Sequence, residues 1–157
     1  MSINKKRLAL SILIPLLVGG ASSLLTRGDM KIYDEIDKPP LAPPGLLFPI
    51  AWGILYILMG ISLYLVWNKN DFRADKSKAY FFFGMSLFLN FIWSPVFFSM
   101  KAFLPAFVIL LLLLVSVILT IVEYYKIDRA AAFLQLPYLV WLLFAGYLNL
   151  AIYYLNG

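Results

Sequence analysis

The residues of this chain that could do chemistry are aromatic rings and a few amides, and they lie inside long apolar segments. Phe48, Trp52, Tyr56 and Met59 recur at i, i+4, i+8 and i+11, so on a helix they form one stripe. Stripes of this kind are usually packing faces. Trp52, however, lies too far along the chain from Trp67 for both indoles to anchor the same membrane surface. The stripe is therefore a candidate wall of a ligand site.

Asn90 is the most informative polar residue, because a carboxamide inside an apolar segment needs partners for two donors and an acceptor. Asn90, Trp93 and Phe97 share a helix face at i, i+3 and i+7. Pro95 cannot donate a backbone hydrogen bond, which frees a carbonyl one turn back, near Phe91. A hydrogen bond between helices, worth about 1 kcal/mol in a bilayer, and contact with a ligand are both open for Asn90.

A third segment places Trp141, Ala145 and Asn149 at i, i+4 and i+8. The small Ala145 leaves room beside the indole of Trp141, although a helix crossing at this point would explain it equally well. Indoles together with one amide suit a flat, mostly apolar ligand that is held by stacking and one or two hydrogen bonds.

The first apolar segment is rich in small and polar residues, among them Ser11, Gly19, Ser22 and Thr26. Inside a bilayer such residues let helix backbones approach closely. We interpret this segment as a tightly packed helix rather than as a ligand wall.

Several chemistries are excluded by what the chain lacks. It has no His and no Cys, so the commonest metal ligand, the usual general base and any thiol nucleophile are missing, and no metal site is expected. No acidic or basic residue lies in the middle of an apolar run, as proton pumps and ion channels usually need. No nucleophile and base form a recognisable pair.

The composition is that of a membrane protein: 63% of the 157 residues are hydrophobic and only 13% are charged, against about 25% charged in soluble domains. About 20 apolar residues span a bilayer as a helix. The fold class we predict is an all-α membrane protein, a single domain over residues 1–157 with a bundle of five transmembrane helices. The five uncharged runs are Leu8–Thr26, Pro39–Asn68, Ala79–Met100, Ala102–Val122 and Ala130–Gly157.

The distribution of Lys and Arg predicts the orientation. Nine of the 13 lie on the side of the N-terminus and four on the other side, which favours a cytoplasmic N-terminus in the cell membrane. This asymmetry explains the net charge of +5 without nucleic-acid binding. We expect the first helix to be retained rather than cleaved as a signal peptide, because no soluble domain would follow it.

The first connection, Arg27 to Lys38, contains Met30, Tyr33 and Ile36 at every third position. That spacing gives an apolar edge on a short interfacial helix, which we interpret as a lid over the bundle. Four prolines follow between positions 39 and 44. They make a stiff strap that shapes a cavity mouth or simply guides the chain into the next helix.

These residues, taken together, resemble the TspO/MBR family. The resemblance covers nearly the whole chain, because several blocks occur in order at matching spacing. The blocks are Tyr33-Asp34, Lys38-Pro39, Pro43-Pro44-Gly45, Phe48-Pro49, Trp52, Tyr56, Met59-Gly60, Asn90, Trp93-Ser94-Pro95, Phe97-Phe98, Lys101, Pro137-Tyr138-Leu139, Trp141, Leu148 and Asn149.

The resemblance implies a five-helix bundle, often a homodimer, with a pocket under the first loop. In the family this pocket binds porphyrins such as protoporphyrin, and drugs of the benzodiazepine and isoquinoline types; no cofactor is required. It further implies that Trp52 and Trp141 match a pair linked to light-dependent porphyrin breakdown. The implied pocket residues are Tyr33, Pro43, Phe48, Trp52, Tyr56, Asn90, Trp93, Trp141, Ala145 and Leu148.

The chain departs from the family at four informative positions. Many members carry Trp where this chain has Ile32 and Leu41, so its aromatic lid is thinner. Mammalian members have a cholesterol motif with Tyr and Arg where this chain has Leu150 and Tyr154. We therefore predict no sterol specificity.

Three hypotheses follow. The first is a membrane protein that binds metal-free porphyrin as sensor, carrier or scavenger, since the absence of His disfavours axial ligation of haem iron. The second is photooxidative degradation of the bound porphyrin through Trp52 and Trp141. The third is a ligand-free scaffold or stress-response partner whose cavity holds only membrane lipid.

Overall fold

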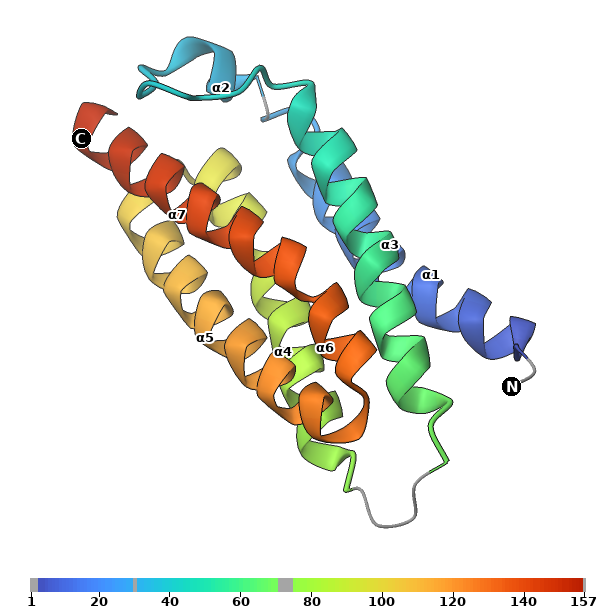
Figure 1. Cartoon of the computed structure of the whole chain (residues 1–157). Coiled ribbons are helices and arrows are strands. Elements are labelled where there is room, and N and C mark those ends of the chain that lie inside the picture. The colour runs from blue at the N-terminus through green and yellow to red at the C-terminus, as the bar shows by residue number, and fades with distance from the viewer. Residues whose placement is uncertain (1–2, 30, 71–74, 157) are drawn as a thin grey trace.

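The computed structural model describes residues 3–29, 31–70 and 75–156 and shows a bundle of long helices (Figure 1). Within these residues every regular element is helical. In chain order the elements are α1 (Lys5–Thr26), α2 (Ile32–Glu35), α3 (Leu47–Trp67), α4 (Ser77–Ser94), the π-helical turn η1 (Pro95–Ser99), α5 (Phe103–Ile127), α6 (Arg129–Leu134) and α7 (Leu136–Asn156).

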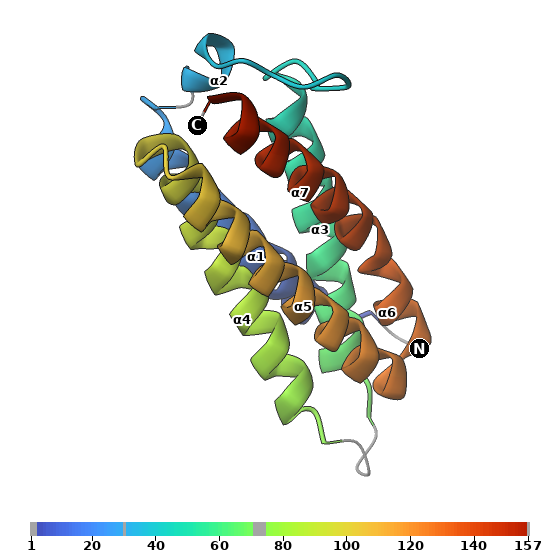
Figure 2. The ribbon, with the colours of Figure 1, turned by 90° about the vertical axis from the view of Figure 1, so that its left-hand side faces the viewer.

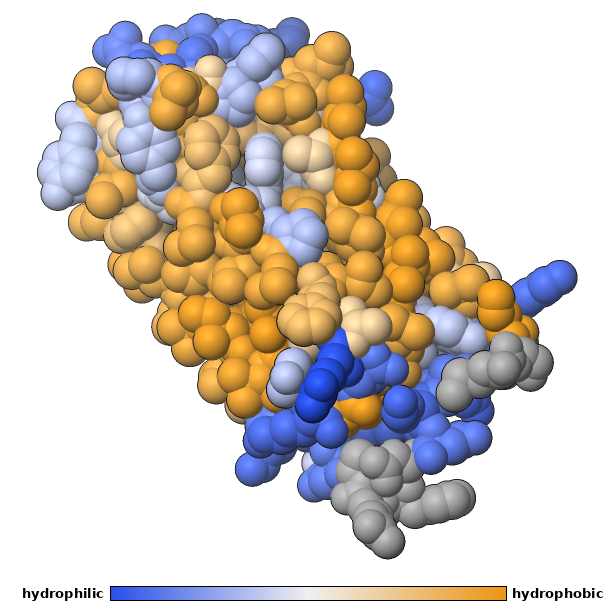
Figure 3. Space-filling model, in the orientation of Figure 1, coloured by the Kyte–Doolittle hydropathy of each residue, from blue (hydrophilic) through white to orange (hydrophobic). Residues whose placement is uncertain are grey.

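The protein is a multi-pass membrane protein, as predicted. Five segments are long and apolar enough to cross a bilayer: α1, α3, α4 with η1, α5, and α6 with α7. Figure 3 shows a broad apolar surface around the middle of the molecule, with polar residues gathered at its two ends. Side chains such as Leu17, Leu24 and Val140 are more than 60% exposed on this surface, which is the expected arrangement for residues that face lipid.

The predicted interfacial helix is present as α2, which spans Ile32–Glu35 and lies over one end of the bundle (Figure 1). Two of its own residues, Ile32 and Tyr33, are buried. Met30, the first residue of the predicted apolar edge, lies outside the described residues. We call residues 31–46, which comprise α2 and the proline strap, the lid.

α1 crosses the bundle obliquely rather than following one neighbour (Figures 1 and 2). At its start, the backbone N–H of Asn4 donates to the hydroxyl of Tyr64 on α3 at 3.0 Å. Near its end, Ser22 Oγ donates to the carbonyl oxygen of Phe91 on α4 at 2.9 Å. This is the carbonyl that Pro95 was predicted to free, and α1 satisfies it.

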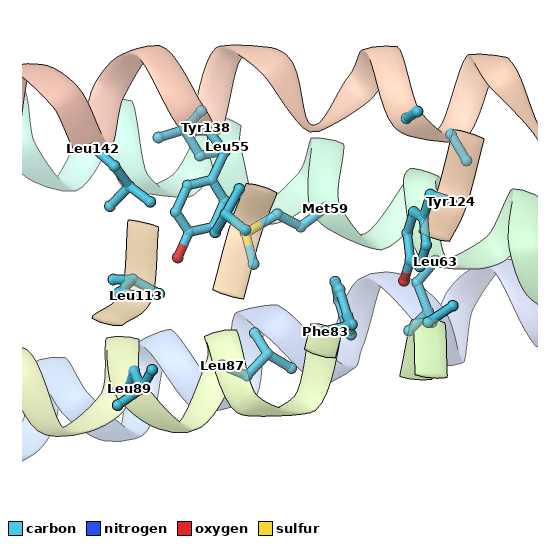
Figure 4. Packing of buried hydrophobic residues seen from close by; sticks show 14 of the residues in the cluster. Leu55, Met59, Leu63, Phe83, Leu87, Leu89, Leu113, Tyr124, Tyr138 and Leu142 are labelled. Carbon is cyan, nitrogen blue, oxygen red and sulfur yellow. The ribbon is translucent and has the colours of Figure 1, made fainter. Parts of the chain in front are cut away.

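The half of the bundle away from the lid is solidly packed (Figure 4). Buried side chains from α3, α4, α5 and α7 form a hydrophobic core there. The large members of this core are Leu55, Met59, Leu63, Phe83, Leu87, Leu113, Tyr124, Tyr138 and Leu142.

The predicted fifth helix is formed by two helices, α6 and α7, that meet at Gln135. Pro137 has no N–H to donate to the carbonyl of Phe133, so the regular helix is interrupted there. The buried Gln135 Nε2 instead donates to Ser62 Oγ at 3.1 Å, and Ser62 Oγ donates to the carbonyl of Ala131 at 2.7 Å. The break thus ties the fifth span to α3.

The contact between α1 and α3 yields a stability prediction. A methyl group added to Gly60 would overlap the backbone of Ile12, whereas one added to Gly84 on α4 would meet no atom within 4 Å. We expect Gly60→Ala to destabilise the protein by about 1–3 kcal/mol because α1 must move away. Gly84→Ala is the control and should be neutral or slightly stabilising. Thermal unfolding in detergent measures both; a Gly60→Ala protein as stable as Gly84→Ala would contradict the tight crossing.

Candidate ligand-binding site

A cavity of about 240 Å³ lies in the lid-side half of the bundle, among α1, α3, α4, η1 and α7. It begins where the packed core ends, and Tyr33 of the lid borders it. Its volume is slightly below the about 300–1,000 Å³ of typical ligand pockets. The cavity is also partly open, so a larger guest would extend beyond the enclosed volume.

One wall of the cavity is aromatic and comes from α3 and α7. Trp52 stacks on Tyr56, with ring centroids 5.6 Å apart and planes 26° apart. The edge of Trp52 meets Trp141 at 6.3 Å, and Phe48 meets Trp141 at 6.0 Å. Three residues of the stripe recognised in the sequence, Phe48, Trp52 and Tyr56, therefore border the cavity, and the first two meet Trp141 of α7 there, whereas Met59 is buried in the core.

Asn90 joins three helices at the inner end of the cavity. Its Nδ2 donates to the hydroxyl of Tyr138 on α7 at 2.8 Å, and the hydroxyl of Tyr56 on α3 donates to its Oδ1 at 3.4 Å. Asn90 is 5% exposed and also borders the cavity. The carboxamide thus forms the interhelical hydrogen bonds that one interpretation required, and it lies where the other interpretation placed a ligand.

A second carboxamide lies closer to the lid. Trp93 Nε1 donates to Asn149 Oδ1 at 3.0 Å, and Asn149 Nδ2 donates to the carbonyl of Phe103 at 2.8 Å. Asn149 was noticed in the sequence for its spacing but was not predicted as a site residue. Its place in an otherwise apolar helix face, two turns from Trp141, is the signal that could have identified it.

Trp141 borders the cavity and contains a buried donor without a partner. Its indole Nε1 is buried and has no hydrogen-bond partner. The two other buried side-chain atoms without a partner among the described residues, Ser11 Oγ and Tyr124 O–H, do not border the cavity. A buried N–H without a partner is costly and is usually satisfied. A guest with a hydrogen-bond acceptor would satisfy it.

The structure brings together nine of the ten predicted site residues. Those that border the cavity are Tyr33, Phe48, Trp52, Tyr56, Asn90, Trp93, Trp141, Ala145 and Leu148. Pro43 is the exception: it lies in the lid, where its carbonyl accepts the hydroxyl of Tyr33 at 2.7 Å. Whether any of these residues binds a ligand stays a prediction.

The sequence interpretation missed the contribution of α1. Leu16, Gly19, Gly20, Ser22 and Ser23 border the cavity, although the small residues of this helix were assigned to packing alone. The small residues of α1 both border the cavity and pack closely, because Gly19 also packs directly against the ring of Tyr56. Small residues that allow a close approach in one direction leave space in another, and a sequence does not show the direction.

Ile32 and Leu41, the two lid positions that depart from the family, differ in their burial. Ile32 is buried in a cluster with Tyr33, Phe97 and Leu148. Leu41 is 82% exposed and has a positive φ of 71°. Of the two replacements, only Ile32 therefore changes the underside of the lid.

No metal site is formed by the residues that the structure describes, since they contain no cluster of three acidic side chains. The cavity is bordered by indole and phenol rings, which are suited to packing against an aromatic guest. Electron-rich indoles at the wall could also take part in oxidation.

The fold and the cavity define a five-span α-helical membrane protein with an aromatic-walled cavity under a lid. The TspO/MBR family model matches residues 11–155. The chain belongs to this family.

Individual relatives match over three quarters or more of both chains. The chain is 43% identical to "Tryptophan-rich protein TspO" of Archaeoglobus fulgidus, covering 98% of this chain and 99% of the relative. It is 34% identical to "Translocator protein" of Bos taurus, covering 87% of this chain and 82% of the relative. It is 33% identical to "Tryptophan-rich sensory protein" of Cereibacter sphaeroides, covering 79% of this chain and 76% of the relative.

The lid gives a prediction about pH. Burial raises the pKa of the Tyr33 hydroxyl, and the neighbouring Asp34 carboxylate raises it further. A raised folded-state pKa means that the stability Tyr33 contributes is fully present below its unfolded pKa and is lost as the pH rises through the folded pKa. The hydrogen bond to Pro43 is therefore intact at neutral pH.

We expect Tyr33→Phe to cost about 1 kcal/mol, equally at pH 6 and pH 8. Subtracting the phenolate absorbance of Tyr33→Phe from that of the wild type isolates the titration of this one tyrosine. The pH at the midpoint of that titration should lie above 10.0, the ordinary pKa of a tyrosine. A midpoint below that value would show that the lid leaves Tyr33 in water.

Proposed function

We propose that this protein binds metal-free porphyrins of the protoporphyrin type in the cavity and acts as a sensor, carrier or scavenger of them. The observation that carries the proposal is the aromatic-walled cavity, which is bordered by Trp141, a residue whose buried Nε1 has no partner. A flat tetrapyrrole offers large faces for Trp52 and Trp141 to pack against and acceptor atoms for the free N–H. Relatives named as sensory and translocator proteins support a role of this kind.

The charges at the lid end suit the acidic side chains of such a ligand. Arg27 and Lys31 are exposed there. Lys38 Nζ lies 4.8 Å from the centre of the Tyr33 ring and donates to the carbonyl of Tyr33 at 2.7 Å. Cations at the water-facing end can pair with propionates while the ring system stays in the apolar cavity. Because the sequence has no His, we expect metal-free porphyrin to be preferred to haem.

Three further expectations belong to this proposal. The excess of Lys and Arg at the end opposite the lid supports a cytoplasmic N-terminus in the cell membrane, with the lid outside. The aromatic cavity also suits benzodiazepine and isoquinoline drugs. A homodimer is expected from the family resemblance alone.

The binding proposal is tested by tryptophan fluorescence. Micromolar protoporphyrin IX should quench the emission of the purified protein. Trp141→Phe keeps a ring but removes the free N–H, so we expect Kd to rise about three- to tenfold, the loss of one neutral hydrogen bond. Trp67→Phe is the matched control, because Trp67 lies at the opposite end of α3 beneath Arg7. Unquenched wild-type emission would refute porphyrin binding.

A second candidate function is the light-dependent oxidation of bound porphyrin by dioxygen. The contact between Trp52 and Trp141 favours it, because both oxidisable indoles would touch the same guest. We expect the Soret band of the complex to bleach under illumination in air. The Trp52→Phe, Trp141→Phe double variant, compared at equal bound porphyrin, should bleach more slowly. Bleaching at the wild-type rate would exclude a role for the two indoles.

The scaffold hypothesis predicts that Trp52, Asn90 and Trp141 pack against one another without a void. In the structure Trp52 contacts Trp141, but all three residues also border a cavity. The cavity supports the two ligand-based functions, and it fits a scaffold only if membrane lipid fills it.

A further inference from the structure

One side of the cavity is bordered by small residues and faces outward between α1 and α3. We call this side the window; its residues are Leu16, Gly20 and Ser23 of α1 and Pro49 and Gly53 of α3. Gly20, Ser23 and Pro49 are exposed. A Cβ added to Gly20 or Gly53 would meet no atom within 4 Å. Neither glycine is needed for close packing, so the space beside them is open.

The window exists because α1 and α3 diverge toward the lid (Figure 2). At the far end the two helices touch, with Gly60 against the backbone of Ile12. Toward the lid, α1 contacts α4 instead, where Ser22 bonds to Phe91. Further on, the hydroxyls of Thr26 and Ser94 lie 3.4 Å apart. The end of α1 therefore belongs to the α4 side of the cavity, which leaves the gap to α3 uncovered.

The lid closes the end of the cavity and is fixed to α7. Asn156 makes two hydrogen bonds with the backbone of Asp37: its Oδ1 accepts from the N–H at 3.0 Å, and its Nδ2 donates to the carbonyl at 2.9 Å. The hydroxyl of Tyr147 donates to the carbonyl of Pro40 at 2.8 Å. Three hydrogen bonds must break before the lid can lift from α7.

The side between α3 and α7 is closed by rings. Phe48 and Trp52 of α3 both contact Trp141 of α7 edge to face. Passage on this side would have to separate these rings, whereas passage through the window displaces only lipid.

The window faces the acyl chains of one leaflet. Gly20 lies six residues before the last residue of α1, and Gly53 lies six residues after the first residue of α3. At 1.5 Å per residue, both are about 9 Å inside the lid-side helix ends. The hydrocarbon core is about 30 Å thick, so this depth is within the lid-side leaflet.

We propose that the window is the route between bilayer and cavity, and that it admits an amphiphile already dissolved in the lid-side leaflet. The identity of that amphiphile as a porphyrin rests on the proposed function; the route itself does not. A flat apolar ring moves from acyl chains to the aromatic wall without passing through water. Its charged groups stay at the lid end, beside Arg27 and Lys31.

The kinetic test blocks the window. Gly20→Leu and Gly53→Leu each place a branched side chain in open space on a helix, where leucine is well tolerated. For protoporphyrin IX in liposomes we expect both variants to slow association and dissociation, each by about tenfold, because a gate raises the barrier to passage in both directions. Gly84→Leu, at an equally open glycine of α4 outside the cavity, is the matched control.

The same measurement on Asn156→Ala tests passage through the lid. Removing its two hydrogen bonds should leave both rates unchanged if the window is the route. Faster exchange in Asn156→Ala, or wild-type exchange in the Gly20→Leu, Gly53→Leu double variant, would overturn the proposal. A weaker Kd with unchanged association would likewise overturn it, because the leucine would then act in the binding site.

A ligand-free measurement separates this proposal from porphyrin binding. Phosphatidylcholine brominated in its acyl chains quenches indoles that it contacts. We expect such bilayers to quench the wild type and Gly84→Leu alike and the double leucine variant less, because Trp52 lies behind the window beside Gly53. If the wild type binds no protoporphyrin IX, the proposed function fails, but the quenching result still shows whether the window is open to lipid. Equal quenching of all three proteins would refute an open window.

Discussion

The structure depends on one constraint: within a bilayer, polar groups must find their partners inside the protein. Asn90, Asn149 and Gln135 each use a side-chain amide to join helices that are distant in sequence. The carbonyl that Pro95 leaves free is satisfied by Ser22 on another helix. Three buried side-chain atoms of the described residues have no partner, Ser11 Oγ, Tyr124 O–H and Trp141 Nε1, and of these only Trp141 belongs to a residue that borders the cavity.

The same pair of helices produces both close packing and empty space. α1 and α3 are pressed together at Gly60, and Gly19 packs against Tyr56 farther along α1. One residue later, Gly20 faces open space, because neighbouring residues of a helix point in different directions. The crossing thus divides the molecule into a packed half, which gives stability, and a hollow half under the lid. This division explains how a chain of 157 residues can maintain a cavity without a separate domain.

The lid is defined more by its hydrogen bonds than by its rings. Tyr33 holds the strap through the carbonyl of Pro43, and Asn156 holds the lid to α7. Leu41, where many relatives have tryptophan, is turned to the surface, and Ile32 fills the underside with an aliphatic chain. The lid thus contributes one ring, that of Tyr33, to the border of the cavity, and the other rings come from α3, α4, η1 and α7.

The sequence by itself determined the number of spans, the existence of α2 and most of the cavity residues. Hydrocarbon imposes a length on each apolar run, and helical periodicity puts Trp52 with Tyr56, and Trp141 with Ala145, on one face each. The sequence could not show the helix break at Gln135, the exposure of Leu41 or the contribution of α1 to the cavity. Those features depend on where helices cross. Small residues such as Gly19 and Gly20 have the same propensity wherever they lie, and only tertiary structure decides which of them touches a neighbour and which borders a space.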